Sequence, residues 1–193
     1  MENNQIPKFI YIHIPKTGGS SVKEIFNQTD YIKTIGHVHG LQQKLPIPTF
    51  TLVRNPYYRT LSAYNYLCTG GDGNEADLRD QKRFFEGFEP TIEHFHVFVK
   101  EKLKDIIWQQ VHFLPLTYFC VFESNLLIDF AMKLEELDSS WKGLCDYLGI
   151  DTPLIKTNEG PKITNKEEWL TPEIKEIIYE IYQPDFINFQ YEK

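Results

Sequence analysis

The sequence has 193 residues, of which 41% are hydrophobic and 15% aromatic, and this composition excludes an intrinsically disordered chain. Its formal net charge of −7 repels polyanions, so we predict no nucleic-acid partner. No apolar run reaches the ~20 residues that a membrane span needs, and the polar start is not a signal peptide, so we predict a cytoplasmic protein with no membrane span. The length predicts a single domain over residues 1–193.

Short apolar runs alternate with helix-like stretches along the chain. We predict strands, in chain order, at 9–14, 31–35, 49–53 and 118–122. We predict helices that begin at Ser20 or Ser21, at 56–67, at 91–107, at 126–148 with a break near 138–140, and at 171–182. Residues 68–74 are typical of a loop. This alternation predicts an α/β fold with a mainly parallel central sheet and helices on both faces.

The segment between the first predicted strand and helix has the composition of an anion-binding loop. Residues 14–21 read Ile-Pro-Lys-Thr-Gly-Gly-Ser-Ser. The glycines let backbone N–H groups approach a phosphate, the helix N-terminus adds partial positive charge, and Lys16 adds a full charge. Because Lys16 precedes the glycines, the order differs from the nucleotide-triphosphate P-loop, where the lysine follows them. An ordinary tight turn with an incidental lysine is the alternative.

A second segment places an arginine and a serine near the end of a predicted central strand. Arg54 follows the strand at 49–53, and open α/β sheets bind ligands at the carboxyl ends of their strands. Ser62 lies two turns along the following helix, so both side chains could hold one phosphate, and arginine is suited to phosphate oxygens. The alternative is an exposed arginine and a surface serine.

Histidines offer a general base. His37 and His39 lie in the glycine-flanked segment 36–40, after the second predicted strand, and histidine suits proton abstraction near neutral pH. In an extended segment His39 shares the side of His37, which predicts a role in binding the acceptor. A pair of solvated loop histidines is the alternative reading.

The remaining histidines do not predict a metal site. His94 and His96 fall on different faces of a predicted helix and cannot converge on one ion, so we predict no metal. His13 lies inside the first predicted strand and is expected as a hydrogen-bonded core histidine.

Together the two segments resemble the sulfotransferases that use 3′-phosphoadenosine-5′-phosphosulfate (PAPS), in particular the family that contains the Golgi carbohydrate sulfotransferases and their soluble bacterial and viral relatives. The resemblance rests on residues 14–21 and 54–64 and continues more loosely over the whole chain, including Gly36 and His37. It implies a P-loop-like sulfotransferase fold. It also implies an enzyme that moves a sulfuryl group from PAPS to a hydroxyl of a carbohydrate-like acceptor and releases PAP.

The resemblance also implies roles for individual residues. Lys16, at the 5′-phosphosulfate, and His37, as the base, would be catalytic. The implied donor-binding residues are Lys16, Thr17, Gly18, Gly19, Ser20 and Ser21 at the 5′ end, and Arg54 and Ser62 at the 3′-phosphate. Some relatives use a carboxylate as the base, which leaves Glu24 and Asp72 as alternatives. A loop at 156–162 is expected to close over the nucleotide.

Two other functions remain as alternatives. A small-molecule kinase would need its lysine after the glycines and a metal-holding aspartate at a strand end. A non-catalytic module that binds PAP or PAPS would not need His37. The acceptor itself, a glycan or a small molecule, is not named by the sequence, although a basic group could attract a sulfated chain; its members are Arg79, Lys82 and Arg83.

Overall fold

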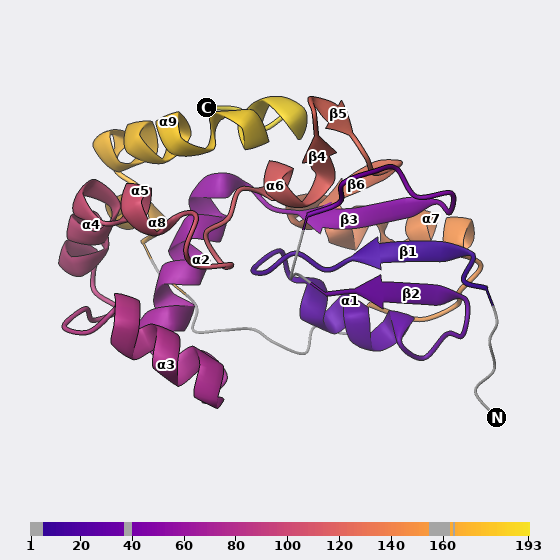
Figure 1. Cartoon of the computed structure of the whole chain (residues 1–193), viewed down its shortest axis with the longest axis horizontal. Helices are drawn as coiled ribbons and strands as arrows, with labels where there is room; N and C mark the ends of the chain where they lie inside the picture. The colour runs from indigo at the N-terminus through magenta and orange to yellow at the C-terminus, as the bar shows by residue number, and fades with distance from the viewer. Residues whose placement is uncertain (1–5, 37–39, 155–162, 164) are drawn as a thin grey trace. The chain divides into compact units, whose positions relative to one another are not determined.

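The structure is a computed structural model that describes residues 6–36, 40–154, 163 and 165–193. The chain, drawn in Figure 1, divides into two compact units. The first consists of Met1–Arg54 and Leu116–Glu159 and is called the sheet unit here. The second consists of Asn55–Pro115 and Gly160–Lys193 and is called the helical unit. The single domain over 1–193 stays a prediction.

Parallel strands form the centre of the sheet unit. They are β1 (Phe9–Ile12), β2 (Ile32–Ile35), β3 (Thr49–Val53) and β6 (Phe130–Lys133). All neighbours pair in parallel in the order β2-β1-β3-β6, and the arrows of β1, β2 and β3 point the same way in Figure 1. The α/β class and the mainly parallel sheet are therefore confirmed. Because the carboxyl ends of parallel strands meet at one edge, the chain leaves all four strands on the same side.

One core joins the sheet to two helices, α1 (Gly19–Phe26) and α7 (Leu137–Leu148). Tyr11 of β1 meets Phe26 of α1 edge to face, with ring centroids 5.1 Å apart. Phe26 in turn stacks on Trp141 of α7 at 6.4 Å. Aromatic pairs in these geometries add to the free energy of burial, and they fix α1 against β1 just beyond the segment at 14–18.

Two predicted elements of the sheet unit were wrong. The predicted strand at 118–122 and the first part of the predicted helix at 126–148 are replaced by α6 (Leu116–Cys120), β4 (Val121–Phe122), β5 (Asn125–Leu126), β6 and the 3₁₀ turn η1 (Leu134–Glu136). A short apolar run does not by itself distinguish a strand from a helical turn. Distant pairing decides here, because the Asp129 N–H donates to the Thr49 carbonyl at 2.7 Å and the Thr49 N–H donates to the Asp129 carboxylate at 2.8 Å.

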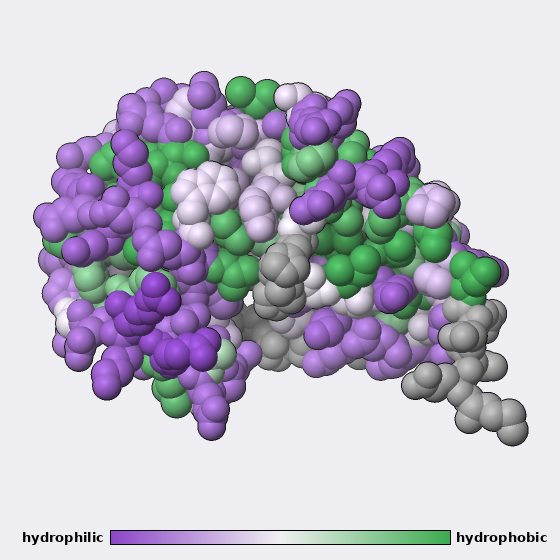
Figure 2. All heavy atoms as spheres, viewed as in Figure 1, coloured by the Kyte–Doolittle hydropathy of each residue, from purple (hydrophilic) through white to green (hydrophobic). Residues whose placement is uncertain are grey.

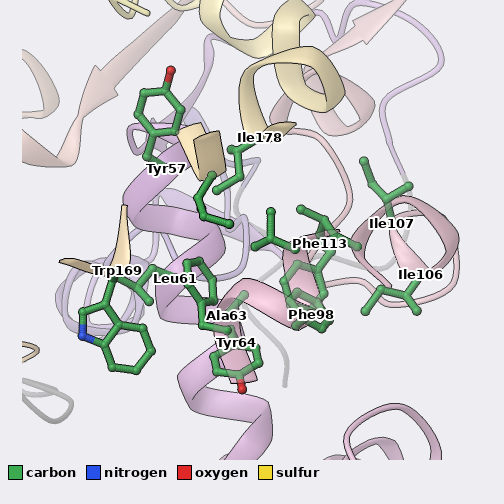
Figure 3. Close-up of a cluster of buried hydrophobic side chains, with 14 of the residues drawn as sticks. Tyr57, Leu61, Ala63, Tyr64, Phe98, Ile106, Ile107, Phe113, Trp169 and Ile178 are labelled. Carbon is green, nitrogen blue, oxygen red and sulfur yellow. The ribbon is translucent and has the colours of Figure 1, made fainter. Parts of the chain in front are cut away.

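The helical unit packs around α2, and its elements largely match the prediction. They are α2 (Pro56–Cys68), α3 (Glu75–Phe84), α4 (Ile92–Glu101), α5 (Leu103–Ile106), α8 (Lys166–Trp169) and α9 (Pro172–Asn188). Proline begins α2 and α9, and the side chains of Asn55 and Thr171 cap them. Figure 3 shows Tyr64, Phe98 and Phe113 in the buried cluster of this unit. The tyrosines of α2 that are buried here therefore belong to a core.

Helix α3 had no counterpart among the predicted elements. Its start is fixed by Asn74, whose side chain accepts from the Asp77 N–H at 3.0 Å. Burial alone would raise the pKa of Asp77, but hydrogen bonds from the Tyr66 hydroxyl, the Asp72 N–H and the Asn74 amide stabilise the carboxylate and hold its pKa below the ordinary value. This local network explains an ordered helix in a stretch whose hydrophobic pattern is weak.

The surface of α3 is mainly hydrophilic in Figure 2, although Leu78 on this helix is exposed. Arg79, Lys82 and Arg83, the basic group of the sequence analysis, are exposed on this helix. Arg79 Nε lies 3.8 Å from Asp80 Oδ1 in a loose ion pair. Ion pairs near the surface contribute little to the free energy of unfolding. A role of this group in attracting an anionic acceptor stays a prediction.

Candidate functional site

The chain turns sharply between β1 and α1, at the segment predicted to bind an anion. Lys16 is half-buried and has a φ of 65°, which is uncommon for a residue with a side chain. Thr17 is fully buried, and its hydroxyl donates to the Ile14 carbonyl at 2.9 Å. Gly18 follows with a φ of 77°. Backbone strain of this kind concentrates at functional sites, where the surrounding structure maintains it.

A side chain would be unfavourable at two glycines of this segment. A Cβ at Gly18 would lie 2.5 Å from Leu134 Cδ1, just after β6. A Cβ at Gly19 would overlap the Tyr11 hydroxyl and the His13 ring. At Gly18 the φ of 77° is what favours glycine, because the Leu134 methyl group could move aside, whereas at Gly19 the Tyr11 hydroxyl and the His13 ring occupy the position of a Cβ.

The first turn of α1 presents backbone donors at this point. Gly18 is its N-cap and supplies no side-chain hydrogen bond, and the first turn carries no acidic residue. The first N–H groups of a helix have no partner within the helix, and the helix dipole favours an anion there. Ser20 is exposed and Ser21 half-buried in the same turn. The predicted residues Lys16, Thr17, Gly18, Gly19, Ser20 and Ser21 thus come together around one helix N-terminus.

Arg54 lies at the end of β3 and joins this group. Its Nη1 donates to the Lys16 carbonyl oxygen at 3.2 Å. A guanidinium keeps its charge at all relevant pH values, so the loop carries a fixed positive charge on its flank as well as Lys16 itself. This contact brings together residues from the two segments that the sequence singled out, and it also gives Arg54 a bracing role that the sequence did not predict.

Ser62 lies on α2 in the helical unit, where it is half-buried. Its convergence with Arg54 on one phosphate stays a prediction. His37 and His39 lie outside the described residues, as does the loop at 156–162. The strand β2 ends at Ile35, on the edge of the sheet where β1 and β3 also end. Beyond the histidines, the Leu41 N–H donates to the Phe119 carbonyl at 3.1 Å.

The structure adds residues that sequence reasoning missed. His13 was expected in the core, but it is half-buried beside Gly19, and its N–H donates to the Ile35 carbonyl at 2.9 Å. Tyr11 lies next to it on the same side of β1, as the alternation of side chains along a strand requires. That alternation could have identified Tyr11. Leu134 could not be found, because its neighbourhood was predicted as a helix.

The histidines of α4 have structural partners. The Glu89 N–H donates to His94 Nδ1 at 2.8 Å, and His96 Nε2 lies 3.1 Å from the Trp169 carbonyl oxygen. Within the described residues, no three or more histidine, cysteine or acidic side chains are grouped so that they could hold a metal ion. The helices in the described part of the chain are also too short or too polar to cross a membrane.

A comparison with protein-family models matches residues 4–192 to the sulfotransferase family. Searches of curated proteins and of solved structures gave no match. The family match covers nearly the whole sequence and includes both segments on which the resemblance rests.

Proposed function

This chain belongs to the sulfotransferase family, and from that premise we propose that it transfers the sulfuryl group of PAPS to a hydroxyl of a carbohydrate-like acceptor. The observation that carries the proposal is the loop at 15–19. A lysine, two glycines that tolerate no side chain and an uncapped helix N-terminus meet there, and Arg54 braces the loop from the end of β3. Fixed positive charge and oriented N–H groups are what a phosphosulfate requires.

The residues fit the donor in chemical type. The N–H groups of the first turn of α1, with Thr17 to Ser21, would hold its 5′-phosphate, and Lys16 would lie at the phosphosulfate. Arg54 and Ser62 would hold the 3′-phosphate. PAPS supplies the activated sulfuryl group. The protein supplies alignment and positive charge where the leaving group becomes negative, and His37 would take the proton of the acceptor hydroxyl.

A kinase function is less well supported than sulfuryl transfer. The lysine of the loop precedes its glycines, whereas the nucleotide-triphosphate P-loop places its lysine after them. A non-catalytic binding module remains the second candidate, because it would share every described feature of the loop.

Nucleotide selectivity tests the donor assignment. We expect PAP to bind at least about tenfold more tightly than AMP, because charge-assisted hydrogen bonds to the 3′-phosphate contribute about 1.5–3 kcal/mol each. ATP with Mg²⁺ should bind weakly. Calorimetry with the three nucleotides measures their dissociation constants. Equal affinity for PAP and AMP would show that the protein has no 3′-phosphate site.

Two variants separate the roles of Arg54. If Arg54 holds the 3′-phosphate, Arg54→Ala and Ser62→Ala should both reduce the ratio of PAP to AMP affinity. If Arg54 only braces the loop through the Lys16 carbonyl, Arg54→Ala should weaken PAP and AMP equally and leave the ratio unchanged. Ser62→Ala serves as the matched control, because it removes one hydroxyl and leaves the loop intact.

A further inference from the structure

A buried hydroxyl without a hydrogen-bond partner lies directly beneath the first residue of α1. Tyr11 is fully buried, and its Oη makes no hydrogen bond in the described structure. Burial raises the pKa of Tyr11, so the hydroxyl keeps its proton and remains a polar donor. Buried hydroxyls are nearly always hydrogen-bonded, because leaving one unpaired destabilises the folded state. This exception therefore needs a physical reason.

The position of Tyr11 supplies the reason. Its hydroxyl occupies the space where a Cβ of Gly19 would be, and His13 Nε2 lies 2.9 Å from the same point. The ring is fixed from the other side, by Phe26 at 5.1 Å and Phe50 at 5.5 Å between centroids. Tyr11 is thus a rigid support between the core of the sheet unit and the backbone of Gly19.

What Tyr11 supports is the uncapped end of a helix of eight residues. A phenylalanine would fill the same core but would leave only the His13 ring beside Gly19. The hydroxyl oxygen is the Tyr11 atom that lies against Gly19, and its unmade hydrogen bond destabilises the free protein. Polar groups that weaken a fold in this way are found where position matters for a ligand.

We propose that Tyr11 is a positioning residue of the anion site, whose hydroxyl supports Gly19 from below and so holds the first N–H groups of α1 where they bind a tetrahedral oxyanion. The proposal rests on the proposed function for the identity of the oxyanion, a phosphate ester. Tyr11 acts through Gly19 and does not itself touch the ligand.

The test compares Tyr11→Phe with Tyr182→Phe. Tyr182 is a matched control in the helical unit, because it is equally buried but its hydroxyl donates to the Phe113 carbonyl at 2.7 Å. Urea unfolding without ligand measures stability, and calorimetry measures affinity for PAP and for inorganic sulfate. Tyr11→Phe should keep or raise the urea midpoint and weaken PAP about tenfold, equivalent to ~1.4 kcal/mol. Tyr182→Phe should lower the midpoint and leave PAP affinity within about twofold of wild type.

The outcomes separate this inference from the proposed function. If Tyr11→Phe leaves PAP affinity unchanged, at whatever midpoint, Tyr11 is an ordinary core residue and the inference is overturned. If the wild type binds sulfate but not PAP, the proposed function fails, and a weaker affinity of Tyr11→Phe for sulfate still supports the inference. If the wild type binds neither anion, no anion site exists at α1 and both are wrong.

Discussion

Replacing His37 with alanine is expected to lower the turnover number by ~10²- to 10⁴-fold while the affinity for PAP stays nearly unchanged. A general base acts on the acceptor hydroxyl and not on the nucleotide, so its loss affects the chemical step. Single-turnover kinetics with saturating PAPS, with PAP affinity measured alongside, separates the two effects. His39→Ala is the matched control, and it should lower turnover less and act mainly through the acceptor.

The dependence of activity on pH should also change in His37→Ala. His37 must be neutral to accept a proton, so activity should fall as the pH falls through its pKa. The ordinary value for histidine, near ~6.5, places this acid limb between about pH 5.5 and 7.5. The limb should disappear in His37→Ala. If the variant keeps turnover within a few fold and retains the limb, the base lies elsewhere, and Glu24, exposed on α1, becomes the next candidate.

Lys16→Ala is expected to lower turnover by about 10²- to 10³-fold, a larger loss than its loss of PAP affinity. If Lys16 lies at the phosphosulfate as proposed, its charge would act mainly when the leaving oxygen becomes anionic, and an interaction made mainly in the transition state affects turnover more than binding. The backbone at Lys16 is held by Arg54 Nη1 on its carbonyl oxygen, so the loop should survive the loss of the side chain.

The control for this variant is Lys23→Ala, which removes an exposed lysine from the last turn of the same helix. It should leave both turnover and PAP affinity near the wild-type values. Lys16→Ala with wild-type turnover and only a weaker PAP affinity would show that Lys16 is a binding anchor without a catalytic role.

Elements of the fold were predicted correctly from the sequence where their signals lie within a few residues of one another. The run at 49–53, ended by Asn55 and Pro56, is β3 followed by α2, because the proline and the asparagine cap act locally. The glycines at 18–19, between an apolar run and a helical stretch, likewise predicted the tight turn between β1 and α1, because strand, turn and helix signals lie next to one another in the chain. Arg54 was placed at the correct edge because the sheet is parallel.

Elements whose conformation depends on contacts with distant parts of the chain were not predicted correctly. Phe130–Lys133 was predicted as part of a helix. In the structure it is strand β6, because the hydrogen bonds between Asp129 and Thr49 hold it beside β3. The approach of Leu134 to Gly18 joins residues far apart in the sequence, and no periodicity within one segment predicts it. Tyr11 lies on the strand just before Gly19, and the alternation of side chains along that strand could have identified it.

The proposed sulfuryl transfer can be observed directly with labelled PAPS. The protein would be incubated with PAPS carrying a heavy sulfur isotope and a library of glycans and small phenols, and the products read by mass spectrometry, with Lys16→Ala as the control. We expect a labelled sulfate ester on at least one hydroxyl acceptor, formed by the wild type and strongly reduced in the variant. A phosphorylated product from ATP and Mg²⁺, with no sulfated product from PAPS, would show that the proposed function is wrong.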